Sequence, residues 1–179
     1  MNIIDALVAH HEQLRSLYAR AEADPAAFDE YTRQLGVHHT MEEKYFYDFL
    51  VKLPEAEAEA HDGVNEHQII EMIMLDSKRF PRDHALFPVK VEGLGEYTNH
   101  HLEDEETVIF PLARQKLATG EQERLGGLFV QAKDALLGVV LPEAAAAGSA
   151  RGARSTPKKG PGKPPTPGSS GLGIGGLKE

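Results

Sequence analysis

The sequence predicts an all-α protein: an up-down-up-down four-helix bundle with a short fifth helix and a disordered C-terminal tail. Two observations predict the helices. Apolar residues recur every three or four positions through most of residues 1–141, which is the period of an amphipathic helix. Segments that alternate Val, Ile or Thr with polar residues, as half-buried strands do, are absent from the sequence.

Prolines mark the ends of the predicted helices. Proline has no N–H and disfavours helical geometry in the residue before it, so Pro25, Pro54 and Pro81 each end a helical run. Pro111 falls inside the fourth run and should bend its last turns. Four long helices joined by short connections favour the up-down-up-down arrangement. The expected helices cover residues 2–23, 26–53, 55–80, 84–117 and 121–141.

The chain is expected to divide into a helical body, residues 1–141, and a tail, residues 142–179. The tail is rich in Gly, Pro and Lys and has almost no apolar surface to bury, so we predict that it is disordered. The tail is net basic, whereas the whole chain has a formal net charge of −9, so the body is strongly acidic. An acidic body argues against nucleic acid as a partner and suits a protein that admits metal cations.

The composition excludes several kinds of site. The sequence has no cysteine and nine histidines, so it can form no disulfide, thiolate zinc site or iron–sulfur cluster. Any metal must be held by His, Asp, Glu or Tyr. The lack of cysteine fits a reducing compartment, no stretch approaches the ~20 apolar residues of a membrane span, and no secretory signal is visible. We therefore expect a cytoplasmic protein with no membrane partner.

Histidines and glutamates interrupt the helical faces that should be apolar. When each face is followed in steps of three and four residues, every long helix carries a histidine, and three of them carry a glutamate one turn later. These residues are His11 in the first helix, His38 and Glu42 in the second, His67 and Glu71 in the third, and His101 and Glu105 in the fourth.

Carboxylates and imidazoles on a buried face need compensation. Burying an ionised carboxylate without a partner costs several kcal/mol, and few Lys or Arg residues lie on the same faces. A bound multivalent cation would compensate all of these groups together. A histidine and a glutamate four residues apart lie on one helical face about 5–6 Å apart, so each pair can bind one metal or straddle two. The pattern therefore predicts a metal site inside the bundle.

The second and fourth helices contain similar segments. Residues 38–43, HHTMEE, align with residues 101–106, HLEDEE, and each segment is followed by aromatic and apolar residues. One His-x-x-x-Glu pair alone would indicate a surface pair, because helices are rich in both residue types. Two pairs in phase with apolar faces, together with His11 and His67, indicate two similar half-sites on opposite helices. Such an arrangement is how a two-metal centre would be built.

These segments resemble the hemerythrin, or HHE cation-binding, family over residues 1–118. The resemblance rests on residues 11–15 (HEQLR), on the two His-x-x-x-Glu-Glu segments, on Glu66-His67, and on Phe110-Pro111. It implies two non-haem iron ions joined by an oxo or hydroxo bridge and by two bridging carboxylates, Glu42 and Glu105. The ligands that the resemblance implies are His11, His38, Glu42, His67, His101 and Glu105.

The chain departs from the oxygen-carrying hemerythrins at Glu71, where they have a second histidine in the third helix. Two interpretations of Glu71 stay open: it is a further metal ligand, or it is turned to the surface. Tyr45 shares the predicted face of His38 and Glu42; it is expected first as a core tyrosine and second as a neighbour of the metal. The neighbours of the predicted ligands are rotated by about 100° from them and are expected at the surface or behind the ligands; these are His10, His39 and His100.

The resemblance implies a small diatomic or peroxide ligand at the iron pair, namely O2, NO or H2O2. Some hemerythrin-like proteins of this size are regarded as catalases, and an anionic Glu71 ligand would stabilise ferric iron. The first hypothesis is therefore disproportionation of hydrogen peroxide, a function in oxidative stress. The alternative is a non-catalytic sensor, scavenger or carrier of O2, NO or iron. A third hypothesis is a plain helical interaction module whose histidines bind adventitious metal, so whether the protein is an enzyme stays open here.

Overall fold

The structure is a computed structural model that describes residues 1–138. All regular elements in this range are helical, which confirms the all-α prediction. The predicted tail, residues 142–179, lies outside the described residues, as do the last residues of the predicted fifth helix. Among the described helices, none is long and apolar enough to cross a membrane.

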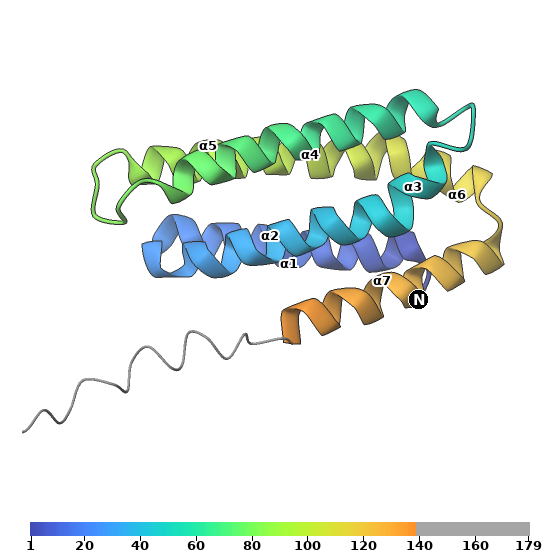
Figure 1. The fold of residues 1–179 in the computed structure, drawn as a ribbon, viewed down its shortest axis with the longest axis horizontal. Helices are drawn as coiled ribbons and strands as arrows, with labels where there is room; N and C mark the ends of the chain where they lie inside the picture. The colour runs from blue at the N-terminus through green and yellow to red at the C-terminus, as the bar shows by residue number, and fades with distance from the viewer. Residues whose placement is uncertain (139–179) are drawn as a thin grey trace, which may run out of the picture. The chain divides into compact units, whose positions relative to one another are not determined.

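Five helices make up most of the described chain (Figure 1). They are α1 (Ile3–Ala23), α2 (Phe28–Glu42), α4 (Glu57–Lys78), α5 (Phe87–Asp104) and α7 (Thr119–Gly138). Shorter elements extend or connect them: the 3-10 turn η1 (Pro25–Ala27), the π-helical turns η2 (Glu43–Tyr47) and η3 (Glu105–Ile109), and the short helices α3 (Asp48–Leu50) and α6 (Phe110–Lys116). The predicted breaks at Pro25, Pro54 and Pro81 all fall between long helices.

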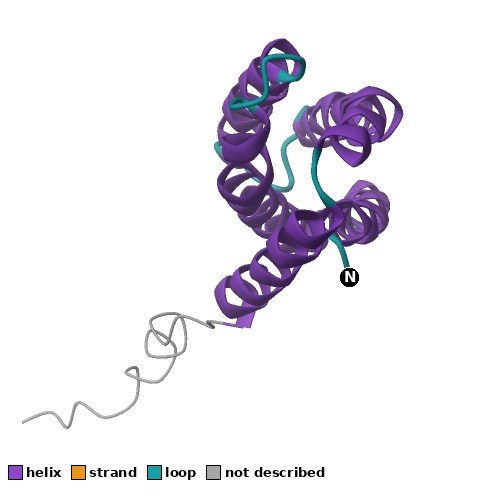
Figure 2. Ribbon diagram, turned by 90° about the vertical axis from the view of Figure 1, so that its right-hand side faces the viewer, coloured by secondary structure: helices purple, strands orange, loops and turns teal. Residues whose placement is uncertain are grey.

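The long helices form two antiparallel pairs. α1 packs against α2, α4 packs against α5, and contacts between α1 and α5 and between α2 and α4 close the bundle. α7 packs against α1 and α2, on the side of that pair away from α4 and α5 (Figures 1 and 2). Gly126 allows this approach, because a Cβ at this position would lie 2.5 Å from the backbone of Met1 and Asn2. The predicted four-helix bundle with a fifth helix is therefore confirmed.

Side-chain caps start α1 and the η1 turn that leads into α2. The side chain of Asn2 accepts a hydrogen bond of 2.9 Å from the backbone N–H of Asp5 and so caps α1. Asp24 caps η1 in the same way through the N–H of Ala26, with Pro25 at the first position of the turn. The η1 turn lies between α1 and α2, so the chain reverses within a few residues and α2 packs back along α1.

The apolar core is divided into two clusters, with a polar layer between them. One cluster contains Leu7, Phe46 and Phe110, and the other contains Leu14 and further residues from the opposite end of the bundle. On α1, α2 and α4 the buried histidines fall between residues of the first cluster and residues of the second, and His101 lies near the end of α5 where the second cluster gives way to the first in η3. The fold therefore seals the polar layer at both ends with packed side chains.

The two helices that carry the similar segments, α2 and α5, leave α geometry at or immediately after the glutamate of the His-x-x-x-Glu pair. The π turn η2 begins one residue after Glu42, and the π turn η3 begins at Glu105 itself. A π turn contains one extra residue, so every following side chain is rotated by about 100° relative to a continuous α-helix. As a result, Tyr47 and Ile109 are buried, whereas Val108, which the α-helical pattern places on the buried face, is 52% exposed.

Candidate metal centre

The polar layer consists of histidines and glutamates that point to the middle of the bundle. The side chains of Glu42 and Glu105 are fully buried, and no histidine in the layer is more than 6% exposed. Each of the four bundle helices, or the turn that extends it, contributes at least one group. The histidines of the layer are His10, His11, His38, His39, His67 and His101.

Two four-residue groups of potential metal ligands overlap at the glutamates. One group consists of His11, His38, Glu42 and Glu105, and the other consists of Glu42, His67, His101 and Glu105. Within each group, one ligand atom from every residue lies within 4.8 Å of the others. Glu42 and Glu105 belong to both groups, so the two groups share two carboxylates.

The ligand atoms of these groups lack hydrogen-bond partners. Among residues 1–138, both carboxylate oxygens of Glu42 and one of Glu105 have no partner, and neither do the Nε2 atoms of five histidines, namely His11, His38, His39, His67 and His101. Each unpaired buried polar group costs about 1–3 kcal/mol. A group that pairs with all of these atoms would stabilise the fold, and a bound cation fits that requirement.

The distances between neighbouring ligand atoms agree with this interpretation. Nε2 of His11 lies 3.2 Å from Oε2 of Glu105, and Nε2 of His38 lies 3.2 Å from Oε2 of Glu42. Nε2 of His67 lies 3.6 Å from the same Glu42 oxygen. Two ligands at right angles on one metal, with bonds of about 2.1 Å, are about 3 Å apart. The site therefore needs little rearrangement to bind a metal.

Carboxylates behind three of the histidines fix which nitrogen faces the centre. Nδ1 of His11 is 2.8 Å from Oε1 of Glu106, and Nδ1 of His101 is 2.7 Å from Oε2 of Glu66. His67 makes the equivalent contact with Glu43 at 3.0 Å. A carboxylate can only accept a hydrogen bond, so Nδ1 carries the proton and Nε2 presents its lone pair to the centre. Such outer carboxylates orient metal-binding histidines in many proteins.

His38 is held by a neutral chain of hydrogen bonds instead of a carboxylate. The amide nitrogen of Gln34 donates to Glu30, which leaves the amide oxygen to accept from Nε2 of His10 at 3.2 Å. Nδ1 of His10 therefore accepts from Nδ1–H of His38, also at 3.2 Å. The consequence is the same as for the other three histidines, because Nε2 of His38 keeps its lone pair and faces the centre.

Burial and neighbouring charges set the protonation of the layer. Burial lowers the pKa of His38 and His39 well below the ordinary value, so both imidazoles are neutral donors. Burial, together with the nearby Glu105, raises the pKa of Glu42 well above its ordinary value, because two buried carboxylates without a cation repel each other. The hydrogen bond from His11, with Arg15 nearby, lowers the pKa of Glu106 to about 2. Glu106 therefore stays ionised, whereas the raised pKa of Glu42 means that its carboxylate needs a nearby positive charge to ionise readily.

A family model decides the classification of this site. The model of the hemerythrin HHE cation-binding domain matches residues 2–113, a range that includes all four bundle helices. This chain belongs to the hemerythrin HHE cation-binding family. Membership implies a His/Glu metal-binding site, and the clustered donor atoms fit one.

A solved hemerythrin-fold structure supports the same architecture. The crystal structure of a hemerythrin HHE cation-binding domain-containing protein from Mycobacterium kansasii matches with a TM-score of 0.69 and 22% sequence identity. The match covers 84% of this chain and 96% of that chain. At this identity the likeness establishes the fold alone. The comparison with curated proteins gives no match.

Tyr47, not Tyr45, lies at the centre of this hemerythrin domain. The Tyr47 hydroxyl donates a hydrogen bond of 2.5 Å to Oε1 of Glu105. Gly63 makes room for it, because a Cβ there would overlap the Tyr47 hydroxyl. Tyr45 is half-buried, with the Lys44 ammonium 5.2 Å from the centre of its ring. Tyr45 packs against the first apolar cluster, and the π turn η2 places Tyr47, instead of Tyr45, against Glu105.

Glu71 lies outside both ligand groups and is exposed. The buried face of α4 runs from His67 through Ile70 to Met74, and Ile70 is fully buried. Glu71 is therefore one position beyond the face, which favours the second of its two interpretations, a glutamate turned to the surface. The other predicted ligands all lie in the two groups described above; they are His11, His38, Glu42, His67, His101 and Glu105.

The three histidines expected off the ligand faces have different environments. His100 is exposed, as expected, and lies 3.5 Å from Asp104. His10 lies behind His38, as described above. His39 is buried, and its ring stacks on that of His67 with a centroid distance of 3.9 Å. Sequence reasoning missed His39 because strict helical phasing allowed only one position per turn to face the centre.

A cavity of about 210 Å³ leads to the centre between α2 and α4. A liquid water molecule occupies about 30 Å³, so the cavity has room for a peroxide molecule and several waters. It ends at two of the buried histidines. Most of its lining residues have polar side chains; the lining consists of Gly36, His39, Thr40, Glu43, His67, Gln68, Glu71 and Met74.

The carboxylates behind the histidines give a first testable prediction. Glu66→Gln keeps the shape of the side chain but removes the charge that accepts from Nδ1 of His101. Loss of such an outer partner weakens metal binding by about 10- to 100-fold. Metal titration of the metal-free protein against a competing chelator measures the change. Glu71→Gln, an exposed glutamate on the same helix, is the control and should leave affinity unchanged; equal losses in both variants would contradict this role of Glu66.

Proposed function

We propose that this hemerythrin domain binds two iron ions, bridged by Glu42 and Glu105, and that the iron pair disproportionates hydrogen peroxide. The observation that carries the two-metal proposal is the overlap of the two ligand groups at these glutamates. His11 and His38 would complete one metal position, and His67 and His101 the other. Neutral imidazoles and carboxylates without thiolate suit iron or manganese.

The iron pair, when bound, would supply the two-electron oxidation and reduction that peroxide disproportionation requires. One H2O2 is reduced to two molecules of water, and a second H2O2 is oxidised to O2. The protein's own groups would hold the protons for this exchange. The Tyr47 hydroxyl holds a proton at Oε1 of Glu105, and the outer carboxylates keep the Nδ1 protons on the histidines.

The lining of the cavity between α2 and α4 favours peroxide over the diatomic ligands. Its polar groups, among them Thr40, Glu43 and Gln68, can form hydrogen bonds with H2O2. O2 and NO form weak hydrogen bonds at best, so a polar passage gives them no comparable advantage. The polar side chains along the passage support a small polar molecule as the physiological ligand. We also propose that the protein acts in the cytoplasm, because a chain without cysteine fits a reducing compartment.

A non-catalytic carrier or sensor of O2 or NO is the second candidate function. The observation that favours it is the surface position of Glu71, because the third anionic ligand that would stabilise ferric iron is then missing. A centre richer in neutral imidazole donors favours ferrous iron and reversible ligand binding. The two candidates therefore differ in what the reduced centre does with oxygen and what the oxidised centre does with peroxide.

Oxygen evolution separates the two functions. Iron-loaded protein is mixed with H2O2 under anaerobic conditions, and an oxygen electrode records the O2 released per peroxide consumed. The peroxide proposal predicts one O2 for every two H2O2, with no loss of iron during turnover. A protein that binds iron, releases no O2 and forms a reversible, spectroscopically stable O2 adduct in its reduced form would instead be a carrier. A protein that binds no iron would disprove the two-iron proposal itself.

A further inference from the structure

We propose that His39 is an additional metal ligand and joins His67 and His101 at one of the two metal positions. The inference rests on the proposed two-metal centre and specifies the ligands of that centre. The predicted ligand set contained one histidine from each bundle helix. With His39, α2 contributes two adjacent histidines, His38 to one metal and His39 to the other.

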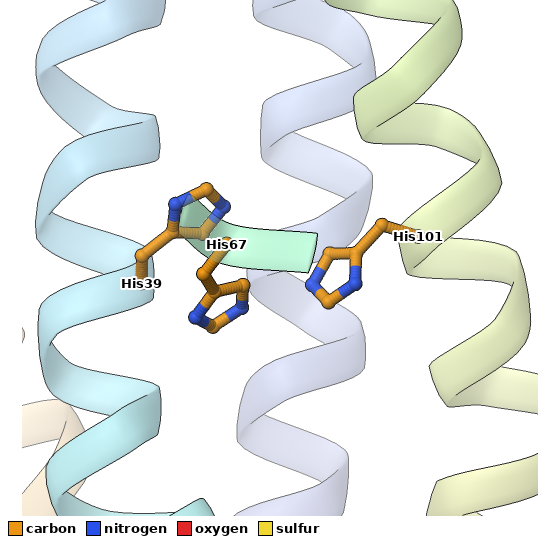
Figure 3. Close-up of side chains that lie close together, drawn as sticks. All are labelled: His39, His67 and His101. Carbon is orange, nitrogen blue, oxygen red and sulfur yellow. The ribbon is translucent and has the colours of Figure 1, made fainter. Parts of the chain in front are cut away.

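The geometry of the three histidines carries this inference. One ring nitrogen of each of His39, His67 and His101 lies within 4.8 Å of the others, and all three side chains are buried. Figure 3 shows them projecting from three different helices into the same space. Nε2 of His39 has no hydrogen-bond partner among residues 1–138, in common with Nε2 of His67 and of His101. The group is therefore a third set of potential ligands, and it shares two members with the group that contains the glutamates.

The other two neighbours of ligand histidines lack this combination. His10 precedes His11 and is buried, but both of its nitrogens have partners, in Gln34 and His38. His100 precedes His101 and is exposed near Asp104. Among these three histidines, His39 alone combines burial, an unpartnered nitrogen and close approach to other unpartnered nitrogens. A place next to a ligand histidine in the sequence therefore does not by itself explain why His39 is buried at the centre.

Packing alone does not account for His39. Its ring stacks on His67 at an interplanar angle of 13°, and a phenylalanine would provide the same stack without burying an unpaired nitrogen. His101 lies with its ring nearly perpendicular to that of His39, at a centroid distance of 6.0 Å. An imidazole in this place is explained if its nitrogen binds the cation that the neighbouring imidazoles bind.

The consequence is a pair of unequal metal positions. The position near His11 has two imidazoles and the two shared carboxylates. The position near His67 has a third imidazole in addition. Because neutral nitrogen donors favour borderline divalent cations, the second position should bind ferrous iron more tightly than the first. The cation class expected at His39 is therefore Fe²⁺, with Mn²⁺ bound more weakly.

His39→Phe is the variant that tests this role. Phenylalanine preserves the stack on His67 and removes only the ligand nitrogen. Purified metal-free protein is titrated anaerobically with Fe²⁺ in the presence of a competing chelator, and the melting temperature is measured with and without Fe²⁺. His39→Phe should retain the melting temperature of the metal-free wild type, or exceed it, and should lose at least about 10-fold in affinity at one of the two positions. His100→Phe is the matched control and should match the wild type in both measurements.

Two further measurements keep the test decisive. In His39→Ala, free imidazole should restore Fe²⁺ affinity, because it can occupy the space and supply the nitrogen. X-ray absorption of the iron-loaded wild type should contain more imidazole scattering per iron than the same measurement on either variant. Unchanged Fe²⁺ affinity in His39→Phe, or no effect of imidazole on His39→Ala, would overturn the role of His39 and leave the two-iron centre standing. Failure of the wild type to bind Fe²⁺ would instead overturn the proposed function.

Discussion

Glu105→Gln is expected to abolish metal binding while the protein stays folded. Glu105 belongs to both ligand groups and lies near His11 and His101 on opposite sides of the centre. An amide binds metal far more weakly than a carboxylate and cannot bridge two cations through two anionic oxygens. Its NH2 group can donate to a histidine Nε2 that lacks a partner, so the metal-free variant should be no less stable than the metal-free wild type. Metal analysis after reconstitution with Fe²⁺ should therefore find almost no bound iron.

The control for this variant is Glu103→Gln. Glu103 is exposed on the same helix, two residues before Glu105, and its substitution changes the net charge by the same amount. If Glu103→Gln retains its full iron content and Glu105→Gln retains almost none, the loss of iron is due to the proposed bridging position of Glu105. Equal iron content in the two variants would mean that Glu105 does not bridge the metals.

Removal of the metals from the wild-type protein is expected to lower its melting temperature by about 10 °C or more. A ligand that binds only the folded state adds about 4 kcal/mol of stability when its concentration is 1,000 times Kd. For a domain of this size each kcal/mol corresponds to about 3 °C. The physical reason is the set of unpartnered atoms in the polar layer, which a cation pairs with and which otherwise remain buried and unpaired.

The same experiment on Glu105→Gln separates this effect from general ion binding. Without its bridging carboxylate, the variant should melt at nearly the same temperature with and without Fe²⁺. Calorimetry or circular dichroism at equal protein concentration measures both differences. A wild-type protein whose melting temperature is unaffected by metal removal would contradict the idea that the metals link the four helices.

Much of the fold and most residues of the candidate metal centre were predictable because α geometry persists up to Glu42 and Glu105. From Phe28 to Glu42 the three- and four-residue steps follow the buried face without a break, and the same is true from Val91 to Glu105. Proline positions located the helix ends. The candidate ligand pairs, His38 with Glu42 and His101 with Glu105, could therefore be predicted from their spacing.

The features that sequence reasoning missed arise where the α period changes or where two faces meet. Nothing in the local sequence indicated the π turn after Glu42, so Tyr45 was expected at the position that Tyr47 occupies. On α4 a step of three residues from His67 leads to Ile70, and a step of four leads to Glu71. The sequence pattern allows both steps, and only the packing of the bundle shows that Ile70 is the buried residue. His39 lies where two buried faces of α2 meet, next to α4, which a single-helix pattern does not reveal.

The iron content of the reconstituted protein tests the central claim most directly. Metal-free protein is loaded anaerobically with excess Fe²⁺, freed of unbound metal by gel filtration, and analysed for iron and protein on the same sample. The two overlapping ligand groups predict about two iron ions per chain, with antiferromagnetic coupling after oxidation because Glu42 and Glu105 hold the ions close together. A protein that saturates at one iron ion per chain, or binds none, would contradict the two-metal account.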